Sequence, residues 1–158
     1  MKNVIVTGGA GFIGSHVCKA LSAAGFNPIV FDNLSTGHAW AVKWGPLVIG
    51  DIHECAALER VFIEYKPCGV IHLAASAYIG ESVSNPAKYY ANNVSGSLSL
   101  FQAILAYGRI PVVFSSTCAV YGIPEILPIT EDCVMAPVNP YGRSKLVVER
   151  ILLDFDAA

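Results

Sequence analysis

The chain has 158 residues, a length that suits one domain with a sizeable core, and its net charge of −2 without a cluster of either sign argues against a nucleic-acid partner. Five cysteines, an odd number without CxxC spacing, indicate free thiols in a reducing compartment and argue against a disulfide framework or a metal site. No apolar run has the length of a membrane span or the form of a signal peptide, so we expect a cytoplasmic protein with no membrane partner.

Three spaced glycines follow a β-branched run at the start of the chain. Residues 4–7 are typical of a strand, Gly8, Gly11 and Gly14 of a tight turn, and residues 12–25 of a helix that ends at a glycine. Glycines let a backbone turn sharply and approach a ligand, while the unpaired N–H groups of a helix N-terminus attract negative charge. This junction suits a pyrophosphate, although a glycine-rich turn without a ligand would have the same pattern.

Short apolar strands alternate with helices along the rest of the chain. Strands are expected at residues 28–32, 47–51, 69–73 and 111–115, and helices at 55–65, 86–107 and 141 to about 154, the last with Asn139 as N-cap and Pro140 at its first position. Residues 33–45 are expected to form a polar loop or short helix, and residues 122–140 a proline-rich loop. This alternation without hairpin signals predicts an α/β fold: a doubly wound parallel sheet, Rossmann-like, with helices on both faces, in one domain over residues 1–158.

Two of the predicted strands end in an aspartate, where doubly wound sheets bind ligands. Asp32 lies 18 residues after Gly14, near the spacing of a carboxylate that binds the adenosine ribose and repels a 2′-phosphate, which favours NAD over NADP. Its alternative role is to cap the turn at residues 33–35. Asp51 has two open interpretations, a contact to adenine or a helix cap paired with Glu54.

Tyr141 and Lys145 lie one turn apart in the last predicted helix, on one face. A lysine ammonium beside a tyrosine favours the phenolate, which would bring the pKa of Tyr141 down from about 10 toward working pH and make it a general base. Such a pair also occurs by chance. Its position after a fifth strand, downstream of the glycine turn, is what favours a catalytic role. Thr117 follows that strand, and its hydroxyl could bind the reacting oxygen or simply end the strand.

Eight stretches of the sequence resemble the extended short-chain dehydrogenases/reductases, an NAD-dependent family. In order they are residues 7–16, 32–37, 50–52, 72–75, 80–83, 89–94, 114–122 and 139–145, and they spread over essentially the whole chain. Within the family, the resemblance is strongest to the branch that holds the bacterial UDP-glucose 4-epimerases.

The resemblance implies a tightly held NAD and a transient hydride transfer at C4 of a UDP-sugar, through a 4-keto intermediate. Tyr141 would remove the proton of the 4-hydroxyl, Lys145 would hold the nicotinamide ribose and polarise Tyr141, and Thr117 would be the hydroxyl partner. UDP-glucose and UDP-galactose are the default substrates; other UDP-sugar pairs, or a related oxidoreductase or decarboxylase reaction, stay open. A homodimer through the helices at 86–107 and 141–154 is also implied.

The residues expected to bind the cofactor come from the glycine turn, the strand ends and the last helix. They are Gly8, Gly11, Phe12, Ile13, Gly14, Asp32, Asn33, Leu34, Ser35, Thr36, Gly37, Asp51, Ile52, Leu73, Ala74, Ala75, Ala77, Asn92, Ser115, Tyr141 and Lys145. No metal is expected.

The chain departs from the family pattern at several positions. Thr117 stands where many members have serine, and Ala77 where some have a lysine that contacts the cofactor. Cys118 and Ala119 replace the Asp-Glu pair of related dehydratases, so dehydration is not expected. The C-terminal domain that grips the nucleotide half of the substrate is expected to be missing. Three interpretations follow: a catalytic epimerase, an NAD-binding module without turnover, or an incomplete chain whose fifth strand is an exposed sheet edge.

Overall fold

A computed structural model describes residues 1–157, which divide into two compact units. The first unit contains Met1–Ala74 and Ser99–Ser115, and the second contains Ala75–Leu98 and the chain from Ser116 onward. Each unit is described by itself.

The first unit is built on a parallel sheet of five strands in the order β3-β2-β1-β4-β5. The strands are β1 (Lys2–Thr7), β2 (Phe26–Asp32), β3 (Leu47–Ile49), β4 (Val70–His72) and β5 (Val112–Phe114). Thr7 lies opposite Phe31 on one side and His72 on the other, so the strand order reverses at β1. The predicted doubly wound parallel sheet is confirmed, and ligands in such sheets bind at the carboxyl ends beside this reversal.

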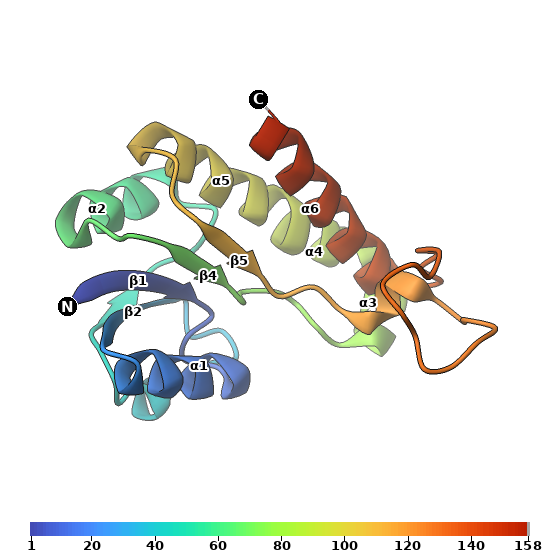
Figure 1. The fold of residues 1–158 in the computed structure, drawn as a ribbon, viewed down its shortest axis with the longest axis horizontal. Helices are drawn as coiled ribbons and strands as arrows, with labels where there is room; N and C mark the ends of the chain where they lie inside the picture. The colour runs from blue at the N-terminus through green and yellow to red at the C-terminus, as the bar shows by residue number, and fades with distance from the viewer. Residues whose placement is uncertain (158) are drawn as a thin grey trace. The chain divides into compact units, whose positions relative to one another are not determined.

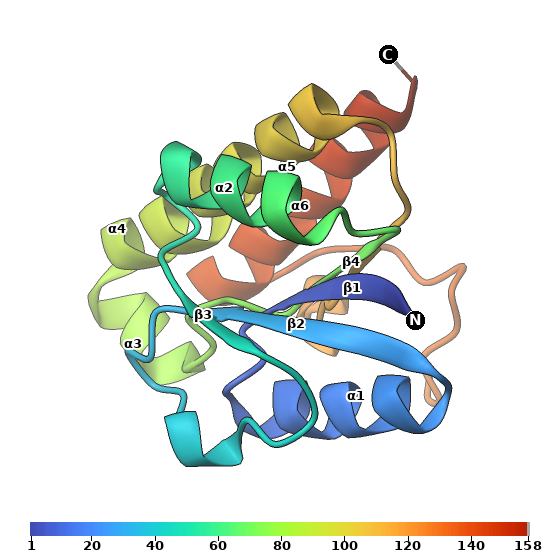
Figure 2. The ribbon, with the colours of Figure 1, turned by 90° about the vertical axis from the view of Figure 1, so that its left-hand side faces the viewer.

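Helices cover both faces of this sheet, as Figures 1 and 2 show. Helix α1 (Phe12–Ala23) lies on one face, while α2 (Cys55–Tyr65) and the part of α5 (Gly96–Tyr107) from Ser99 onward lie on the other. Strands buried from both sides are continuously apolar, and the fully buried side chains Ile5, Ile29 and Leu58 belong to this core. Helix α1 is followed by Gly25 at φ +84°, which confirms the predicted glycine at its C-terminal end.

Three predicted strands prove shorter than expected. β3 ends at Ile49, β4 spans three residues, and β5 stops at Phe114, so Asp51 and Ser115 lie just beyond the hydrogen-bonded ladder. The polar segment at residues 33–45 contains only a short 3-10 turn, η1 (Ala39–Ala41). β5 forms one edge of the sheet, as expected for the fifth strand, and its Val113 is exposed.

The second unit consists of helices and loops. It holds α3 (Ile79–Ser84), α4 (Pro86–Tyr89), the π-helical segment η2 (Tyr90–Ser95), the start of α5, the 3-10 turn η3 (Cys118–Tyr121) and α6 (Pro140–Ala157). Figure 1 shows α6, in red, running alongside α4. The amide N–H of Gly142 donates to Asn139 Oδ1 (2.8 Å), which confirms Asn139 as the N-cap of α6.

Two helix predictions in this unit need correction. The segment expected as one helix over residues 86–107 passes through a π-helical turn at η2, where the backbone accommodates an extra residue. Helix α3 was not predicted, because its short IGESVS sequence carries a glycine and β-branched and serine residues that individually disfavour helix. Helix α6 also continues to Ala157, three residues beyond the expected end.

The close approach of α1 to the loop before it gives a stability prediction. A Cβ on Gly14 would lie 2.2 Å from Gly8 O, a backbone atom that cannot move aside, so Gly14→Ala should destabilise the chain by about 2 kcal/mol or more. Gly80→Ala is the matched control, since a Cβ there meets nothing within 4 Å and should be neutral or stabilising by about 0.5–1 kcal/mol. Urea unfolding of the three proteins measures both values, and equal effects of the two substitutions would contradict the packing described.

Candidate functional site

The glycine loop packs too tightly for side chains at Gly8 and Gly14. Gly8 has φ +70°, and a Cβ there would lie 2.7 Å from Ala74 N. Gly11 is the N-cap of α1, and in the part of the chain that the structure describes, no side chain caps this helix and its first turn holds no acidic residue. Its first N–H groups therefore remain available to an anion.

Two large apolar side chains at the start of α1 are exposed. Phe12 is 83% and Ile13 is 61% exposed, although both begin a helix that packs on a sheet. Both were expected to contact the cofactor. An exposed apolar pair beside uncapped N–H groups fits a ligand with a phosphate and a flat ring system.

The carboxylate of Asp32 joins the glycine loop to the segment after β2. Ala10 N–H donates to Asp32 Oδ2 (3.0 Å) and Leu34 N–H donates to Asp32 Oδ1 (2.8 Å). The second bond is the turn cap that was the alternative role of Asp32. Since each carboxylate oxygen can accept more than one hydrogen bond, this cap leaves room for ribose hydroxyls.

Asp51 does not cap a helix. Helix α2 begins after Glu54, which is its N-cap, so the helix-capping interpretation of Asp51 is wrong. Its Oδ2 instead accepts from Asn33 Nδ2 (2.8 Å), and its Oδ1 accepts from His53 N–H (2.9 Å). Partial burial acts to raise the pKa of Asp51, but these bonds and the His53 ring together outweigh it and hold the pKa below its ordinary value.

Contacts within the first unit link several of the residues that were expected to bind the cofactor. Gly8 touches the Leu73–Ala74 backbone, Asp32 touches the glycine loop, and Asn33 touches Asp51. Ile52 is buried, and Ser115 follows β5, its N–H donating to His72 O (3.1 Å).

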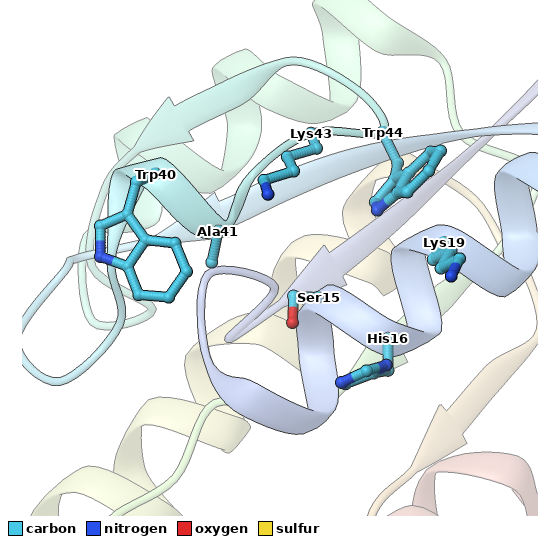
Figure 3. A pocket seen from close by; sticks show the side chains of 7 residues that line it. All are labelled: Ser15, His16, Lys19, Trp40, Ala41, Lys43 and Trp44. Carbon is cyan, nitrogen blue, oxygen red and sulfur yellow. The ribbon is translucent and has the colours of Figure 1, made fainter.

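A pocket of the first unit is lined by side chains from α1 and from the segment around η1, and none of these is a predicted site residue (Figure 3). Its lining combines two lysines, a histidine and two indoles: Ser15, His16, Lys19, Trp40, Ala41, Lys43 and Trp44. The Lys19 ammonium lies 5.8 Å from the Trp44 ring centroid, a cation–π contact that packs this part of the surface.

The predicted catalytic pair lies on the first turns of α6 in the second unit. Lys145 is only 3% exposed, and burial lowers its pKa from 10.5 to about 8. The ammonium expected beside Tyr141 is therefore about half charged at pH 8 and gains its full charge only as the pH falls further. Tyr141 is half-buried, and its carbonyl accepts a hydrogen bond from Ser144 Oγ (2.7 Å).

Thr117 is oriented by the turn that follows it. Its Oγ1 accepts from Ala119 N–H (3.1 Å) and so caps η3. That bond uses an acceptor lone pair and leaves the hydroxyl proton available to donate. The Thr117 hydroxyl can therefore donate a hydrogen bond, as binding to a sugar oxygen requires.

A glycine on α6 brings the two catalytic segments together, and its role was not predicted. A Cβ on Gly142 would lie 2.6 Å from Ala119 O, so only glycine lets α6 approach η3 this closely. The glycine next to Tyr141 inside a helical pattern was the available signal, since such a glycine usually has a packing reason.

Asn93 is a second residue that the sequence did not single out. Its buried side chain lies in η2, and its Nδ2 donates to Ser76 O and to Ser144 Oγ, both at 3.0 Å, while its Oδ1 accepts from Ser76 N–H (2.8 Å). Asn92, the expected cofactor ligand, donates to Asn93 Oδ1 (3.0 Å). The Asn93 side chain thus links Ser76, which lies between Ala75 and Ala77, to Ser144 on α6, which lies between Tyr141 and Lys145.

A sequence model described as the NAD dependent epimerase/dehydratase family matches residues 4–158. The chain belongs to this family. Within residues 1–157, no helix is both long and apolar enough to cross a membrane, and no three His, Cys, Asp or Glu side chains of that range could hold a metal ion together.

Similar proteins of this family are UDP-sugar 4-epimerases. The chain is 50% identical over 154 residues to a UDP-glucose 4-epimerase of Rhizobium meliloti (strain 1021), covering 98% of this chain and 47% of that protein. It is 41% identical over 165 residues to UDP-arabinose 4-epimerase 1 of Arabidopsis thaliana, covering 98% of this chain and 39% of that protein. The chain spans about half the length of the curated relatives it matches.

A crystal structure of UDP-glucose 4-epimerase from Brucella ovis in complex with NAD shares this fold. It superposes with a TM-score of 0.98 at 54% identity, covering all of this chain and 49% of that one. A structure of UDP-glucose 4-epimerase from Bifidobacterium longum in complex with NAD+ and UDP has a TM-score of 0.92 at 38% identity, over 97% of this chain and 48% of that one.

The buried Lys145 predicts a pH-dependent stability. Its pKa is lower in the folded chain than in the unfolded one, so the unfolded state binds more protons between about pH 8 and 10.5, and the free energy of unfolding rises with pH through that window. At pH 7 the buried charge of Lys145 lowers the free energy of unfolding by on the order of 3 kcal/mol. Lys145→Met should therefore be more stable than the wild type at pH 7, and this advantage should shrink toward pH 10.

Urea unfolding of both proteins at several pH values measures the difference. Both keep Cys18, whose pKa burial raises to about 11, so its opposite pH dependence cancels. Lys43→Met, at an exposed lysine, is the control and should change the unfolding free energy by less than about 0.5 kcal/mol. A constant gap between Lys145→Met and the wild type across this pH range would contradict the burial of the lysine.

Proposed function

We propose that this chain binds NAD and supplies the catalytic residues of a UDP-sugar 4-epimerase, with UDP-glucose and UDP-galactose as its substrate pair. The observation that supports this most is that two features occur in one chain. The first unit has a glycine loop, an α1 N-terminus without a side-chain cap, and Asp32 bonded to that loop. The second unit has the hydroxyl of Thr117 together with Tyr141 and the buried Lys145. Similarity to UDP-glucose 4-epimerases over nearly the whole chain supports the same reaction.

The residues present fit NAD. The α1 N-terminus with Gly8, Gly11 and Gly14 would hold the pyrophosphate, because no side chain of residues 1–157 caps its N–H groups. Asp32 would accept hydrogen bonds from the adenosine ribose, and its negative charge would disfavour a 2′-phosphate.

The remaining expected contacts would surround the rest of the cofactor. Those of the first unit are Phe12, Ile13, Asn33, Leu34, Ser35, Thr36, Gly37, Asp51, Ile52, Leu73, Ala74 and Ser115, and those of the second are Ala75, Ala77, Asn92, Tyr141 and Lys145.

The reaction would use the side chains of α6 and η3 for proton transfer. NAD, when bound, supplies the acceptor and later the donor of the hydride at sugar C4. Thr117 would donate its free hydroxyl proton in a hydrogen bond to the sugar 4-oxygen while Tyr141 takes the proton from that oxygen. Below about pH 8, the positive charge of Lys145 would stabilise the Tyr141 phenolate, and loss of that charge would weaken this support.

Dimerisation through the helices at 86–107 and 141–154 belongs to the same proposal. Each region carries exposed apolar side chains, among them Leu105 on α5 and Leu153 on α6. A molecular mass of twice that of one chain in size-exclusion chromatography with light scattering would support it.

The catalytic assignment predicts the behaviour of single variants toward UDP-galactose. The purified chain with NAD should form UDP-glucose, and Tyr141→Phe should lower the rate by at least about 100-fold because the proton acceptor is lost. Reduced-nicotinamide absorbance and product formation are both followed.

Thr117→Ser and Thr117→Val form the matched control pair. Thr117→Ser keeps a hydroxyl and should retain most of the rate, whereas Thr117→Val, of equal size, should lose it. NAD binding without any UDP-glucose would favour the interpretation as an NAD-binding module without turnover, and a Tyr141→Phe rate equal to that of the wild type would contradict the catalytic role.

A further inference from the structure

A second tyrosine, Tyr89, is buried beside Tyr141 and has no part in the proposed proton transfer. Tyr89 ends α4 and is fully buried, and its ring meets the Tyr141 ring edge to face, with centroids 6.4 Å apart and planes at 81°. Both residues belong to the second unit. A tyrosine side chain has only two rotatable bonds, so a fixed neighbouring ring restricts which orientations Tyr141 can take.

The hydroxyl of Tyr89 is held between two acceptors. Its oxygen lies 2.6 Å from Tyr78 O and 2.8 Å from Glu81 Oε2. Burial, followed by the bond to Glu81, raises the pKa of Tyr89 to about 12. Tyr89 therefore stays a protonated phenol at working pH, and it can anchor a ring but cannot act as a general base.

The carboxylate that holds Tyr89 is itself fixed by a lysine. Lys88 Nζ lies 2.6 Å from Glu81 Oε1, and this bond, followed by the one from Tyr89, lowers the pKa of Glu81. Lys88 is placed by α4, whose N-cap Asn85 accepts from Lys88 N–H (3.4 Å). The sequence of contacts runs from Lys88 to Glu81, from Glu81 to the Tyr89 hydroxyl, and from the Tyr89 ring to Tyr141.

We infer that Tyr89 is a positioning residue for Tyr141: the Glu81–Lys88 pair fixes its hydroxyl, and its ring holds the Tyr141 phenol in the orientation needed for proton transfer. This inference rests on the proposed role of Tyr141. Proton transfer requires the phenol oxygen within hydrogen-bond reach of the substrate hydroxyl, and small misplacements of a reacting group cost rate far more than they cost binding.

The first test observes the Tyr141 ring directly and needs no turnover. NMR spectra of the chain with ring-labelled tyrosines identify the Tyr141 signals by their loss in Tyr141→Phe. Tyr89→Leu should shift these signals, because the adjacent ring is removed. Glu81→Gln and Tyr89→Phe, which keep the ring but weaken or remove its anchor, should shift or broaden them as well.

Tyr90→Leu is the matched control, because Tyr90 is the next residue and is 39% exposed. It should leave the Tyr141 signals in place. If Tyr89→Leu does not fold, Glu81→Gln and Tyr89→Phe decide the test. Unchanged Tyr141 signals in the folded Tyr89 and Glu81 variants would overturn the inference.

The second test asks whether this orientation matters for the reaction. In a single turnover of the chain loaded with NAD and mixed with UDP-galactose, Glu81→Gln should lower the rate of nicotinamide reduction by about tenfold, with NAD affinity within about twofold of the wild type. Lys88→Arg, which keeps the ion pair, should retain the rate. A merely structural role would lower NAD affinity and thermal stability together with the rate.

The two proposals fail separately in these tests. An unchanged rate in Glu81→Gln, with shifted Tyr141 signals, would overturn the positioning role. If the wild-type chain binds NAD but shows no reduction, the proposed reaction fails for this chain, while the NMR spectra still decide whether Tyr89 holds Tyr141.

Discussion

The close backbone approach at the junction of β1 and α1 is the constraint on which the first unit depends. A side chain on Gly14 would overlap Gly8 O, and a side chain on Gly8 would overlap Ala74 N, so the loop can pass this point only as bare backbone. Within residues 1–157, no side chain caps the start of α1, which follows this loop directly. Asp32 then ties the loop to the segment after β2 by accepting from Ala10 N–H. One steric condition thus fixes the packing of α1 at the edge of the sheet where we propose that NAD binds.

The second unit depends on a comparable contact between α6 and η3. Gly142 allows this contact, because a side chain there would overlap Ala119 O. The contact places the turn capped by Thr117 against the helix that carries Tyr141 and Lys145. Lys145 on the same helix has almost no exposure, and burial lowers its pKa to about 8. Buried lysines with lowered pKa values cluster at catalytic sites, which agrees with the role proposed for Lys145.

The sequence predicts the parts of this molecule that depend on local pattern. Alternating apolar strands and helices gave the parallel sheet, and the Asn139–Pro140 pair located the start of α6. Helix α3 and the π-helical turn η2 were missed because neither has a periodic apolar signal. Asp51 was open to a capping role because its spacing to Glu54 imitates a capping box, whereas α2 begins only after Glu54. Contacts such as those of Tyr89 with Glu81 and Tyr141 join three segments, and no local pattern reveals them.

The central claim is that the glycine loop and Asp32 bind NAD, and direct titration of the purified chain tests it. Isothermal titration calorimetry with NAD and with NADP requires neither a sugar substrate nor turnover. We expect saturable binding of NAD and at least about tenfold weaker binding of NADP, because in the proposed site the Asp32 carboxylate would repel a 2′-phosphate. A folded chain that binds neither dinucleotide, or that prefers NADP, would contradict this account of the site.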